Sequence, residues 1–342
     1  MKQIVIERPG GYHKLRVGSA PDPAPGEGEV LVDVAAAGVN FADCIIRMGL
    51  YASAKELVGY PITPGFEVAG TVAALGPGAR GPSPGTRVMG LTLFGGYVSK
   101  ICLPADQVFP IPDDLAMEAA AGFPTVFLTA WYALHELAHP HPGDLVLVHS
   151  AAGGVGGALL QLARRLGCRV TGVVGSDSKV ETARSLGAEH VLVRTPDLWQ
   201  RLEKIAPAGF DLVLDANGGP SLRHGYRHLA PGGKLLAYGF HTMLPKGRGR
   251  PSWPKLVLDY LRTPRFNPLD LTRDNRNILA FNLSFMSEKA DLLSRGLRDM
   301  LGWLNSGEIR TLPVTTHPFE DVAAAHRSLE TGATVGKQVL VI

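Results

Sequence analysis

The sequence predicts an α/β protein in which a β-rich region precedes alternating strands and helices around a parallel sheet. Over residues 1–112, glycine and proline separate short β-branched runs, a pattern typical of strands and tight turns. Over residues 144–238, apolar strands alternate with helices, which indicates a parallel sheet covered on both faces. The last ~55 residues are too few for a separate core. We therefore expect this tail to pack on the first region.

Composition sets the limits of this prediction. The length of 342 residues suggests two or three domains. The chain is 45% hydrophobic and 19% charged, which allows a sizeable core. The net charge of +3 is too balanced to imply a nucleic-acid partner. Three widely spaced cysteines, Cys44, Cys102 and Cys168, exclude a disulfide framework and a four-cysteine zinc lobe. We expect a cytoplasmic protein, because the N-terminus is no secretory signal and no apolar run is long enough to span a bilayer.

The individual elements follow from periodicity and turn signals. The predicted strands of the first region are residues 1–8, 29–36 and 66–75. Two helices follow at 117–121 and 125–137, the first capped by Asp113 or Asp114. The alternating region is predicted as strand 145–149, helix 156–166, strand 169–174, helix 179–186, strand 190–193, helix 198–205, strand 210–215, helix 220–229 and strand 234–238. The tail adds strand 279–285, helices 290–305 and 319–329, and strand 337–342.

A basic segment runs from residue 246 to 265. It carries six cations against one acid, Asp259: Lys246, Arg248, Arg250, Lys255, Arg262 and Arg265. Apolar residues lie among these charges at helical spacing: Trp253, Leu256, Val257, Tyr260 and Leu261. We favour a solvated insertion with one apolar face docked on the core. An anion-attracting lid and a membrane-surface patch are the alternatives.

A glycine-rich loop points to a nucleotide. Residues 151–157, Ala-Ala-Gly-Gly-Val-Gly-Gly, follow an apolar strand and open a helix. Ala152, Gly154 and Gly157 fit a relaxed G-x-G-x-x-G pattern. Small residues there allow a tight turn and let the backbone approach a pyrophosphate at the helix N-terminus. The loop therefore predicts a dinucleotide site.

The next strand indicates which dinucleotide. An NAD-selective fold has an acidic residue at the end of this strand for the ribose 2′-hydroxyl. Here the strand ends at Gly175 and Ser176, and Asp177 is displaced into the turn. Lys179 follows, and Arg194 ends the next strand. Cations pair with a 2′-phosphate that a carboxylate would repel, so the sequence favours NADP(H).

No metal site emerges from the histidines. His135, His139 and His141 are close in sequence, but the last two lie in a predicted turn and no further ligand is evident. With neither a metal nor a flavin motif, direct hydride transfer from a nicotinamide is the remaining redox chemistry.

Three motifs resemble those of the zinc-free quinone oxidoreductase branch of the medium-chain dehydrogenases/reductases. They are Gly-Val-Asn-Phe-Ala-Asp at 38–43, Pro-Gly-Phe-Glu-Val-Ala-Gly-Thr-Val at 64–72, and the glycine loop. Within the branch, the chain looks similar to vesicle amine transport protein homologues. The resemblance implies a GroES-like β-barrel catalytic domain at 1–122 and 288–342. It also implies a Rossmann domain, a doubly wound parallel sheet, at 123–287, with the basic insertion at about 245–277.

The resemblance also implies the site. Zinc-dependent relatives place a cysteine at Asn40 and a histidine at Phe66, so two of three ligands are missing here and only Glu67 remains. Asn40 and Tyr51 are the implied catalytic residues. The implied cofactor-binding residues are Asn40, Thr129, Ala152, Gly153, Gly154, Val155, Gly175, Ser176, Lys179, Arg194, Asn217, Tyr238, Gly239, Phe240, Phe281, Asn282 and Lys337.

The resulting hypothesis is an NADPH-dependent reductase that transfers hydride to quinones or other conjugated carbonyl acceptors. The Asn40 amide is the candidate donor to the carbonyl oxygen and the Tyr51 hydroxyl is the second. The alternatives are an enoyl-thioester reductase of polyketide type, and an NADPH-binding adaptor with little activity. By analogy with the branch, we expect a homodimer formed through the edge strand 279–285.

Overall fold

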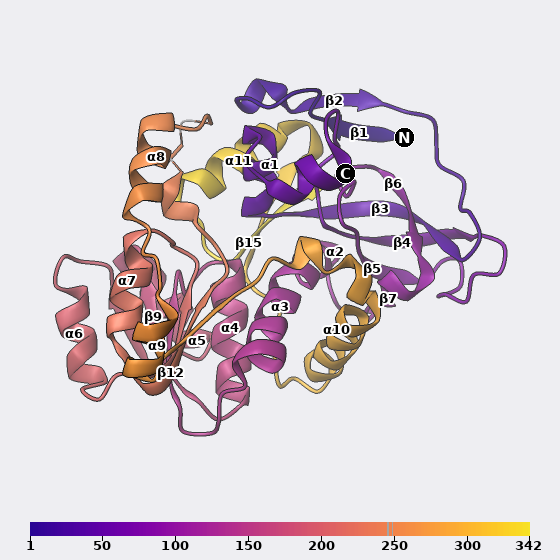
Figure 1. Cartoon of the computed structure of the whole chain (residues 1–342). Coiled ribbons are helices and arrows are strands. Elements are labelled where there is room, and N and C mark those ends of the chain that lie inside the picture. The colour runs from indigo at the N-terminus through magenta and orange to yellow at the C-terminus, as the bar shows by residue number, and fades with distance from the viewer. Residues whose placement is uncertain (245, 248) are drawn as a thin grey trace. The chain divides into compact units, whose positions relative to one another are not determined.

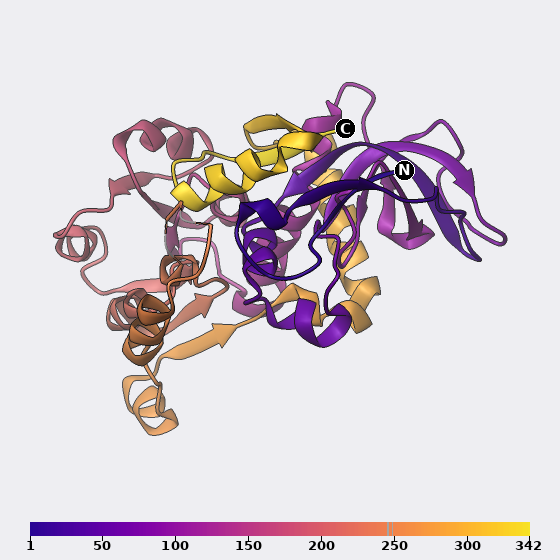
Figure 2. The same ribbon diagram turned by 90° about the horizontal axis from the view of Figure 1, so that it is seen from above.

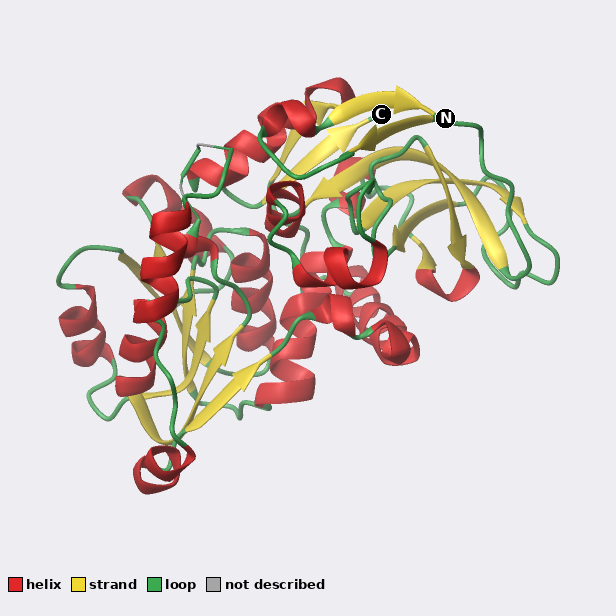
Figure 3. Ribbon diagram, turned by 45° about the horizontal axis from the view of Figure 1, so that its top comes forward, coloured by secondary structure: helices red, strands yellow, loops and turns green. Residues whose placement is uncertain are grey.

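The computed structural model describes residues 1–244, 246–247 and 249–342. Arg248 of the basic segment and Pro245, where the predicted insertion begins, lie outside the described residues. The chain divides into two compact units. Unit 1 comprises Met1–Leu128, Lys246–Arg250 and Leu283–Ile342, and unit 2 comprises Thr129–Pro245 and Pro251–Asn282. Figure 3 shows the strands of each unit gathered into sheets of their own.

Unit 1 is built on a seven-stranded sheet of order β14-β15-β3-β4-β5-β7, in which β6 also pairs with β3. Its strands are β3 (Glu29–Val39), β4 (Glu67–Leu75), β5 (Arg87–Leu91), β6 (Lys100–Pro104), β7 (Val108–Pro110), β14 (Val314–Pro318) and β15 (Lys337–Val341). A two-stranded sheet, β1 (Lys2–Val5) with β2 (Arg16–Ser19), completes the unit.

The eleven-residue strand β3 is the centre of this sheet. One edge pairs with β4. The other edge is shared: β6 pairs with Glu29–Asp33 and β15 pairs with Ala36–Val39. The C-terminal strand therefore completes the sheet that the N-terminal residues begin, and it does so beside the end of β3 that leads into Asn40.

Among the residues that the structure describes, four α-helices lie wholly in unit 1: α1 (Phe41–Met48), α2 (Met117–Ala121), α10 (Ala290–Asn305) and α11 (Val322–Thr331). The unit boundary falls within α3 (Pro124–Trp131). Seen from above, α11 in yellow lies alongside the indigo N-terminal segment (Figure 2). Val322 and Ala325 of α11 join the buried core formed by β3, β4 and β15.

Unit 2 contains a six-stranded sheet of order β10-β9-β8-β11-β12-β13, parallel throughout. The strands are β8 (Leu145–His149), β9 (Arg169–Val174), β10 (His190–Val193), β11 (Phe210–Asp215), β12 (Leu229–Ala237) and β13 (Asn277–Ala280). The helices between them are α4 (Gly154–Arg165), α5 (Val180–Ser185), α6 (Leu198–Ile205) and α7 (Pro220–Arg227). Figure 1 shows α4 and α5 on one side of the sheet, with α6 and α7 on the other. The strand order reverses between β8 and β11, as in a doubly wound dinucleotide fold.

Several predicted elements are confirmed with the same bounds: helices 117–121, 198–205 and 290–305, and strands 169–174, 190–193 and 210–215. Others are wrong in detail. The N-cap of α2 is Ala116, not Asp113 or Asp114. The helix predicted at 125–137 begins at Pro124, because proline is tolerated in a first helical turn, and it becomes a π-helix at Tyr132–Ala138.

The strand predicted at 279–285 is also wrong. The edge strand β13 is Asn277–Ala280, and Leu283–Phe285 forms a 3-10 turn. The physical reason is the length of the neighbour, since Ala280 already pairs with Ala237, the last residue of β12. An alternating sequence alone does not make a strand where no partner backbone remains.

The basic insertion also differs from its prediction. It forms α8 (Trp253–Arg262) and α9 (Pro268–Asp274). No residue of α8 is buried, and Trp253 and Tyr260 are 64% and 68% exposed. Trp253, Val257, Tyr260 and Leu261 share one helix face, so this apolar face is not docked on the core as predicted. Within the described residues, no helix is both long enough and apolar enough to cross a bilayer.

Candidate functional site

The glycine loop turns sharply after β8. Ser150 adopts a positive φ of 55°, a conformation that non-glycine residues seldom hold. A Cβ on Gly156 would lie 2.2 Å from the Ser150 carbonyl oxygen, so only glycine lets α4 pack on this turn. Gly153 is the N-cap of α4. The close approach between the helix and the turn is thus at Gly156. This position is a variable one in the G-x-G-x-x-G pattern that Ala152, Gly154 and Gly157 fit.

The end of β9 carries hydroxyls and a cation. Ser176 and Ser178 share a 2.9 Å hydrogen bond. Lys179 precedes α5 and is only 8% exposed. A Cβ on Gly175 would meet no atom within 4 Å, so the chain leaves open space there. The strand itself ends without a carboxylate, and Asp177 is exposed in the following turn.

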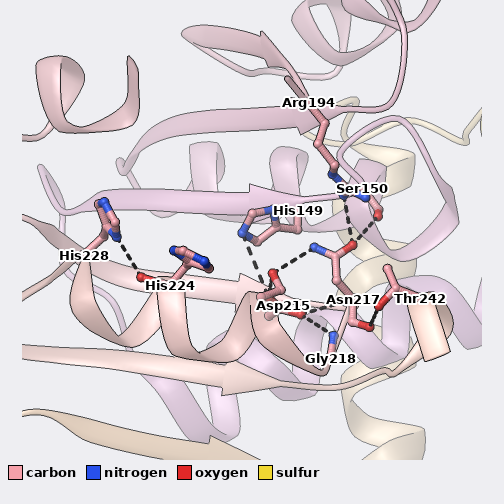
Figure 4. A network of polar contacts seen from close by, with 10 residues as sticks. His149, Ser150, Arg194, Asp215, Asn217, Gly218, His224, His228 and Thr242 are labelled. Atoms are coloured by element: carbon pink, nitrogen blue, oxygen red, sulfur yellow. Dashed lines mark hydrogen bonds and ion pairs between the residues drawn. The ribbon is translucent and has the colours of Figure 1, made fainter. Parts of the chain in front are cut away.

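A polar network joins the ends of three strands of the sheet, β8, β10 and β11 (Figure 4). Arg194, which follows β10, donates a 2.9 Å hydrogen bond to the Asn217 side-chain oxygen. The Ser150 hydroxyl, after β8, lies 3.5 Å from the same oxygen. Asp215 ends β11 and accepts hydrogen bonds from the backbone N–H groups of Asn217 and Gly218, at 2.6 and 2.8 Å. The carboxyl ends of strands at a switch point are where open α/β sheets bind nucleotides.

The electrostatics of this network are set by burial. Burial lowers the pKa of His149, whose Nε2 lies 3.9 Å from the Asp215 carboxylate. Burial, together with the nearby Arg194, lowers the pKa of His241 to about 4. Burial also raises the pKa of the Tyr238 hydroxyl. Both histidines are therefore uncharged at neutral pH, and Arg194 carries the positive charge of the network.

Five of the remaining predicted nucleotide residues follow the carboxyl ends of two further strands of unit 2. Tyr238, Gly239 and Phe240 directly follow β12, and Phe281 and Asn282 directly follow β13. In a parallel sheet the carboxyl ends of the strands share one edge. The Phe281 ring packs 5.0 Å from that of Tyr132. Thr129 is half-buried on α3, and Ala152 is buried in the glycine loop.

Unit 1 holds a separate buried polar cluster of Asn40, Glu67 and Lys337. Gln338 pairs with Val39 across β15 and β3, so the adjacent residues Lys337 and Asn40 meet although they are 297 positions apart. The Lys337 ammonium contacts the Asn40 side-chain oxygen at 2.5 Å and the Glu67 carboxylate at 2.6 Å. The Asn40 amide donates to the same Glu67 oxygen at 2.9 Å. These contacts place Lys337 in the Asn40 cluster.

Two glycines make room for this cluster. A Cβ on Gly38 would lie 2.4 Å from Glu67 Oε1, and one on Gly122 would lie 2.8 Å from Lys337 Cγ. The second Glu67 oxygen accepts a 2.7 Å hydrogen bond from the Thr125 backbone. At Gly38 and Gly122 the backbone therefore lies so close to the cluster that a larger residue would clash with it.

Asp43 connects two of the sequence motifs. Its carboxylate accepts hydrogen bonds from the backbone N–H groups of Asn40 and Gly65, at 2.8 and 3.0 Å, and from the Tyr97 hydroxyl at 2.9 Å. Burial raises the pKa of Asp43 to about 6, against these three hydrogen bonds. Sequence reasoning missed its role. The signal was present, because an Asn followed three residues later by an acid is a helix-start pattern.

Tyr51 has a partner that the sequence did not suggest. Its hydroxyl lies 2.7 Å from that of Ser284, which is buried in the turn after β13. The Tyr51 ring also meets Phe66 edge-on, at 6.1 Å between centroids. No local pattern marks Ser284, because the contact joins positions 233 residues apart.

Comparisons with known proteins agree with this architecture. A model of the alcohol dehydrogenase GroES-like domain matches residues 26–113, and a zinc-binding dehydrogenase model matches residues 186–340. The rat synaptic vesicle membrane protein VAT-1 homolog is 35% identical over all of this chain and 84% of its own length. The Escherichia coli quinone oxidoreductase solved with NADPH is 27% identical, with a TM-score of 0.85 over all of both chains. The CurK enoyl reductase structure is 28% identical, with a TM-score of 0.86 over 99% of this chain and 98% of its own.

The GroES-like unit and the doubly wound sheet with its glycine loop define an oxidoreductase fold. The chain belongs to the medium-chain dehydrogenase/reductase superfamily, in the zinc-free, quinone oxidoreductase-like branch.

Proposed function

We propose that the chain is an NADPH-dependent, zinc-independent reductase that transfers hydride to quinones or other conjugated carbonyl acceptors. The observation that carries the cofactor choice is the end of β9, where Ser176 and the buried Lys179 replace an acidic residue. A lysine favours a 2′-phosphate, whereas a carboxylate would repel it. The NADPH complex of the related Escherichia coli quinone oxidoreductase supports the same choice.

The residues of unit 2 fit a dinucleotide. The close Gly156–Ser150 approach brings the start of α4 against the loop, and the space beside Gly175 is open. Gly153, Gly154 and Val155 would meet the pyrophosphate at a helix N-terminus, which favours anions. The adenosine phosphate would lie among Gly175, Ser176, Lys179 and Arg194, near Asn217. The nicotinamide would be bounded by Thr129, Tyr238, Gly239, Phe240, Phe281 and Asn282.

A bound nicotinamide would supply the hydride. The chain's own contribution is to hold two flat π-systems face to face and to stabilise the acceptor oxygen as it gains negative charge. We assign this second role to the Asn40 amide, with the Tyr51 hydroxyl as a second donor. Quinol and enol oxygens can then take a proton from water, so the chain needs no dedicated proton shuttle.

Two further roles have some support. An enoyl-thioester substrate is favoured by the similarity to the CurK enoyl reductase. An NADPH-binding adaptor role is favoured by the similarity to a vesicle membrane protein and by the exposed apolar face of α8. For each of these roles, and for the quinone reductase, we propose a cytoplasmic homodimer paired through the edge strand β13. A membrane-surface contact is the less favoured use of α8.

The test is oxidation of NADPH and NADH with 1,4-benzoquinone, 9,10-phenanthrenequinone, a simple enone and an enoyl thioester. We expect NADPH oxidation with a quinone that persists in the presence of a chelator. Turnover confined to the enoyl thioester would favour the second substrate class. Tight NADPH binding without turnover of any acceptor would contradict the reductase and favour the adaptor.

A further inference from the structure

We propose that Lys337 is a positioning residue that orients the Asn40 amide so that an N–H, and not the carbonyl oxygen, is presented to the acceptor. The inference rests on the proposed reductase function. It assigns to Lys337 a role in the hydride-accepting half of the site instead of cofactor-phosphate binding.

The orientation follows from what each group can donate. An ammonium only donates hydrogen bonds and a carboxylate only accepts them. The Lys337 ammonium lies 2.5 Å from one end of the Asn40 amide, and Glu67 Oε1 lies 2.9 Å from the other. The end that meets Lys337 must therefore be the oxygen, and the end that meets Glu67 must be the NH2 group. A flipped amide would set NH2 against the ammonium and the carbonyl against the carboxylate.

Burial makes this selection strong. Lys337 is 3% exposed and Glu67 is fully buried, and charges act more strongly where water is excluded. Glu67 cannot turn away, because its other oxygen accepts from the Thr125 backbone. Asp43 is the other acid beside the cluster, and the positive charge of Lys337 lowers its pKa against the larger effect of burial.

One amide hydrogen remains for the acceptor. The Asn40 NH2 group has two hydrogens, and Glu67 takes one of them. Asn40 is 8% exposed, more than Glu67 or Lys337. A donor fixed before the reaction stabilises the developing oxyanion without reorganising. Without Lys337 the amide would lose one of the two contacts that distinguish its ends, and only Glu67 would remain to orient it.

The test compares Lys337→Met, Lys337→Arg and the wild type. We expect Lys337→Met to lower kcat with a quinone ~10- to 100-fold. This is less than the ~100- to 1000-fold cost of removing an oxyanion donor, because the Asn40 amide itself is retained. The NADPH Kd of this variant, measured by fluorescence, should stay within about twofold, because Lys337 acts on Asn40 and not on the cofactor phosphate. A twofold change is equivalent to only about 0.4 kcal/mol. Lys337→Arg should recover part of the rate, because it keeps the charge. An unchanged kcat, or a large rise in the NADPH Kd alone, would overturn the inference, the latter in favour of phosphate binding.

A double variant separates positioning from folding. Glu67→Gln/Lys337→Met leaves no unpaired buried charge, which is the usual cause of unfolding when one partner is removed. We expect it to melt near the wild-type temperature yet remain slow. Wild-type activity in this variant would overturn the inference.

A turnover-free readout separates the inference from the proposed function. If the wild type turns over no acceptor, the reductase proposal fails by itself. Lys337 is then tested by 4-nitrophenolate binding to the NADP⁺-loaded protein, followed by absorbance. We expect the wild type to bind this oxyanion about tenfold more tightly than Lys337→Met, equivalent to ~1.4 kcal/mol. Equal binding would overturn the inference.

Discussion

The backbone N–H of Gly65 donates a 3.0 Å hydrogen bond to the Asp43 carboxylate, and this contact joins two motifs that are separate in sequence. The same carboxylate holds the Asn40 backbone at 2.8 Å. Asp43 therefore fixes the start of α1 and the approach to β4 together. Asn40 and Glu67 depend on it for their relative positions.

Asp43 gives a pH-dependent prediction. Its pKa rises from 3.8 to about 6 on folding. Between pH 4 and 6 the folded state keeps a proton that the unfolded chain has lost, so the Asp43 contribution to stability falls as pH rises. The full shift corresponds to about 3 kcal/mol. Urea unfolding of Asp43→Asn should show the largest deficit against the wild type near pH 4, and this deficit should shrink towards pH 7.

The comparison with Asp43→Asn removes the other titrating groups. The lowered pKa of His241, about 4, makes stability rise with pH over the same range, but it acts equally in both proteins. Asp43→Asn should be less stable than the wild type throughout, because its NH2 group would face the Gly65 N–H. A deficit that does not change with pH would contradict the raised pKa.

Gly156→Ala tests the nucleotide loop. Its methyl group would lie 2.2 Å from the Ser150 carbonyl oxygen, so the backbone of the loop would have to shift. We expect NADPH binding to be lost, as measured by fluorescence titration, with a lowered melting temperature. Gly302→Ala in α10 is the matched control, because a Cβ there meets nothing within 4 Å. It should raise stability by about 0.5–1 kcal/mol and leave binding unchanged. Normal NADPH affinity in Gly156→Ala would contradict the proposed site.

Lys179→Ala tests the cofactor preference. A charge-assisted hydrogen bond contributes about 1.5–3 kcal/mol, so we expect the NADPH Kd to rise ~10- to 100-fold. The NADH Kd should hardly change, because NADH lacks the 2′-phosphate. Lys204→Ala, on the exposed surface of α6, is the control. Equal losses for both cofactors would show that Lys179 does not read the phosphate.

Arg47→Met tests how much the buried ion pair of Arg47 and Glu330 stabilises unit 1. Its guanidinium lies 2.5 Å from Glu330, and both side chains are buried. Removing one partner of a buried pair costs about 3–5 kcal/mol, because the other charge stays buried. We expect Arg47→Met to lose stability of this size in urea unfolding, and Arg47→Met/Glu330→Gln to recover part of it. A double variant no better than the single one would mean that the charge itself is not the cause.

Local pattern was sufficient where an element is defined by its own residues. Strand 210–215 and helix 198–205 were predicted with the bounds that the structure has, because the periodicity of burial is written directly in each segment. The glycine loop was predicted for the same reason, although its closest approach is at Gly156. The same reasoning gave a wrong strand at Leu283–Phe285, because β12 ends at Ala237 and leaves no backbone for these residues to pair with.

The sequence by itself determined the two kinds of unit, the glycine loop, and the cations that favour a 2′-phosphate, because each depends on neighbouring residues. Only the tertiary structure decided what Asn40 meets. Its contacts with Lys337 and Glu67 arise from the register of β15 on one edge of β3 and β4 on the other. Strand register between distant segments is set by packing over the whole sheet. No local pattern could therefore have shown that this ammonium, 297 residues away, orients the amide of Asn40.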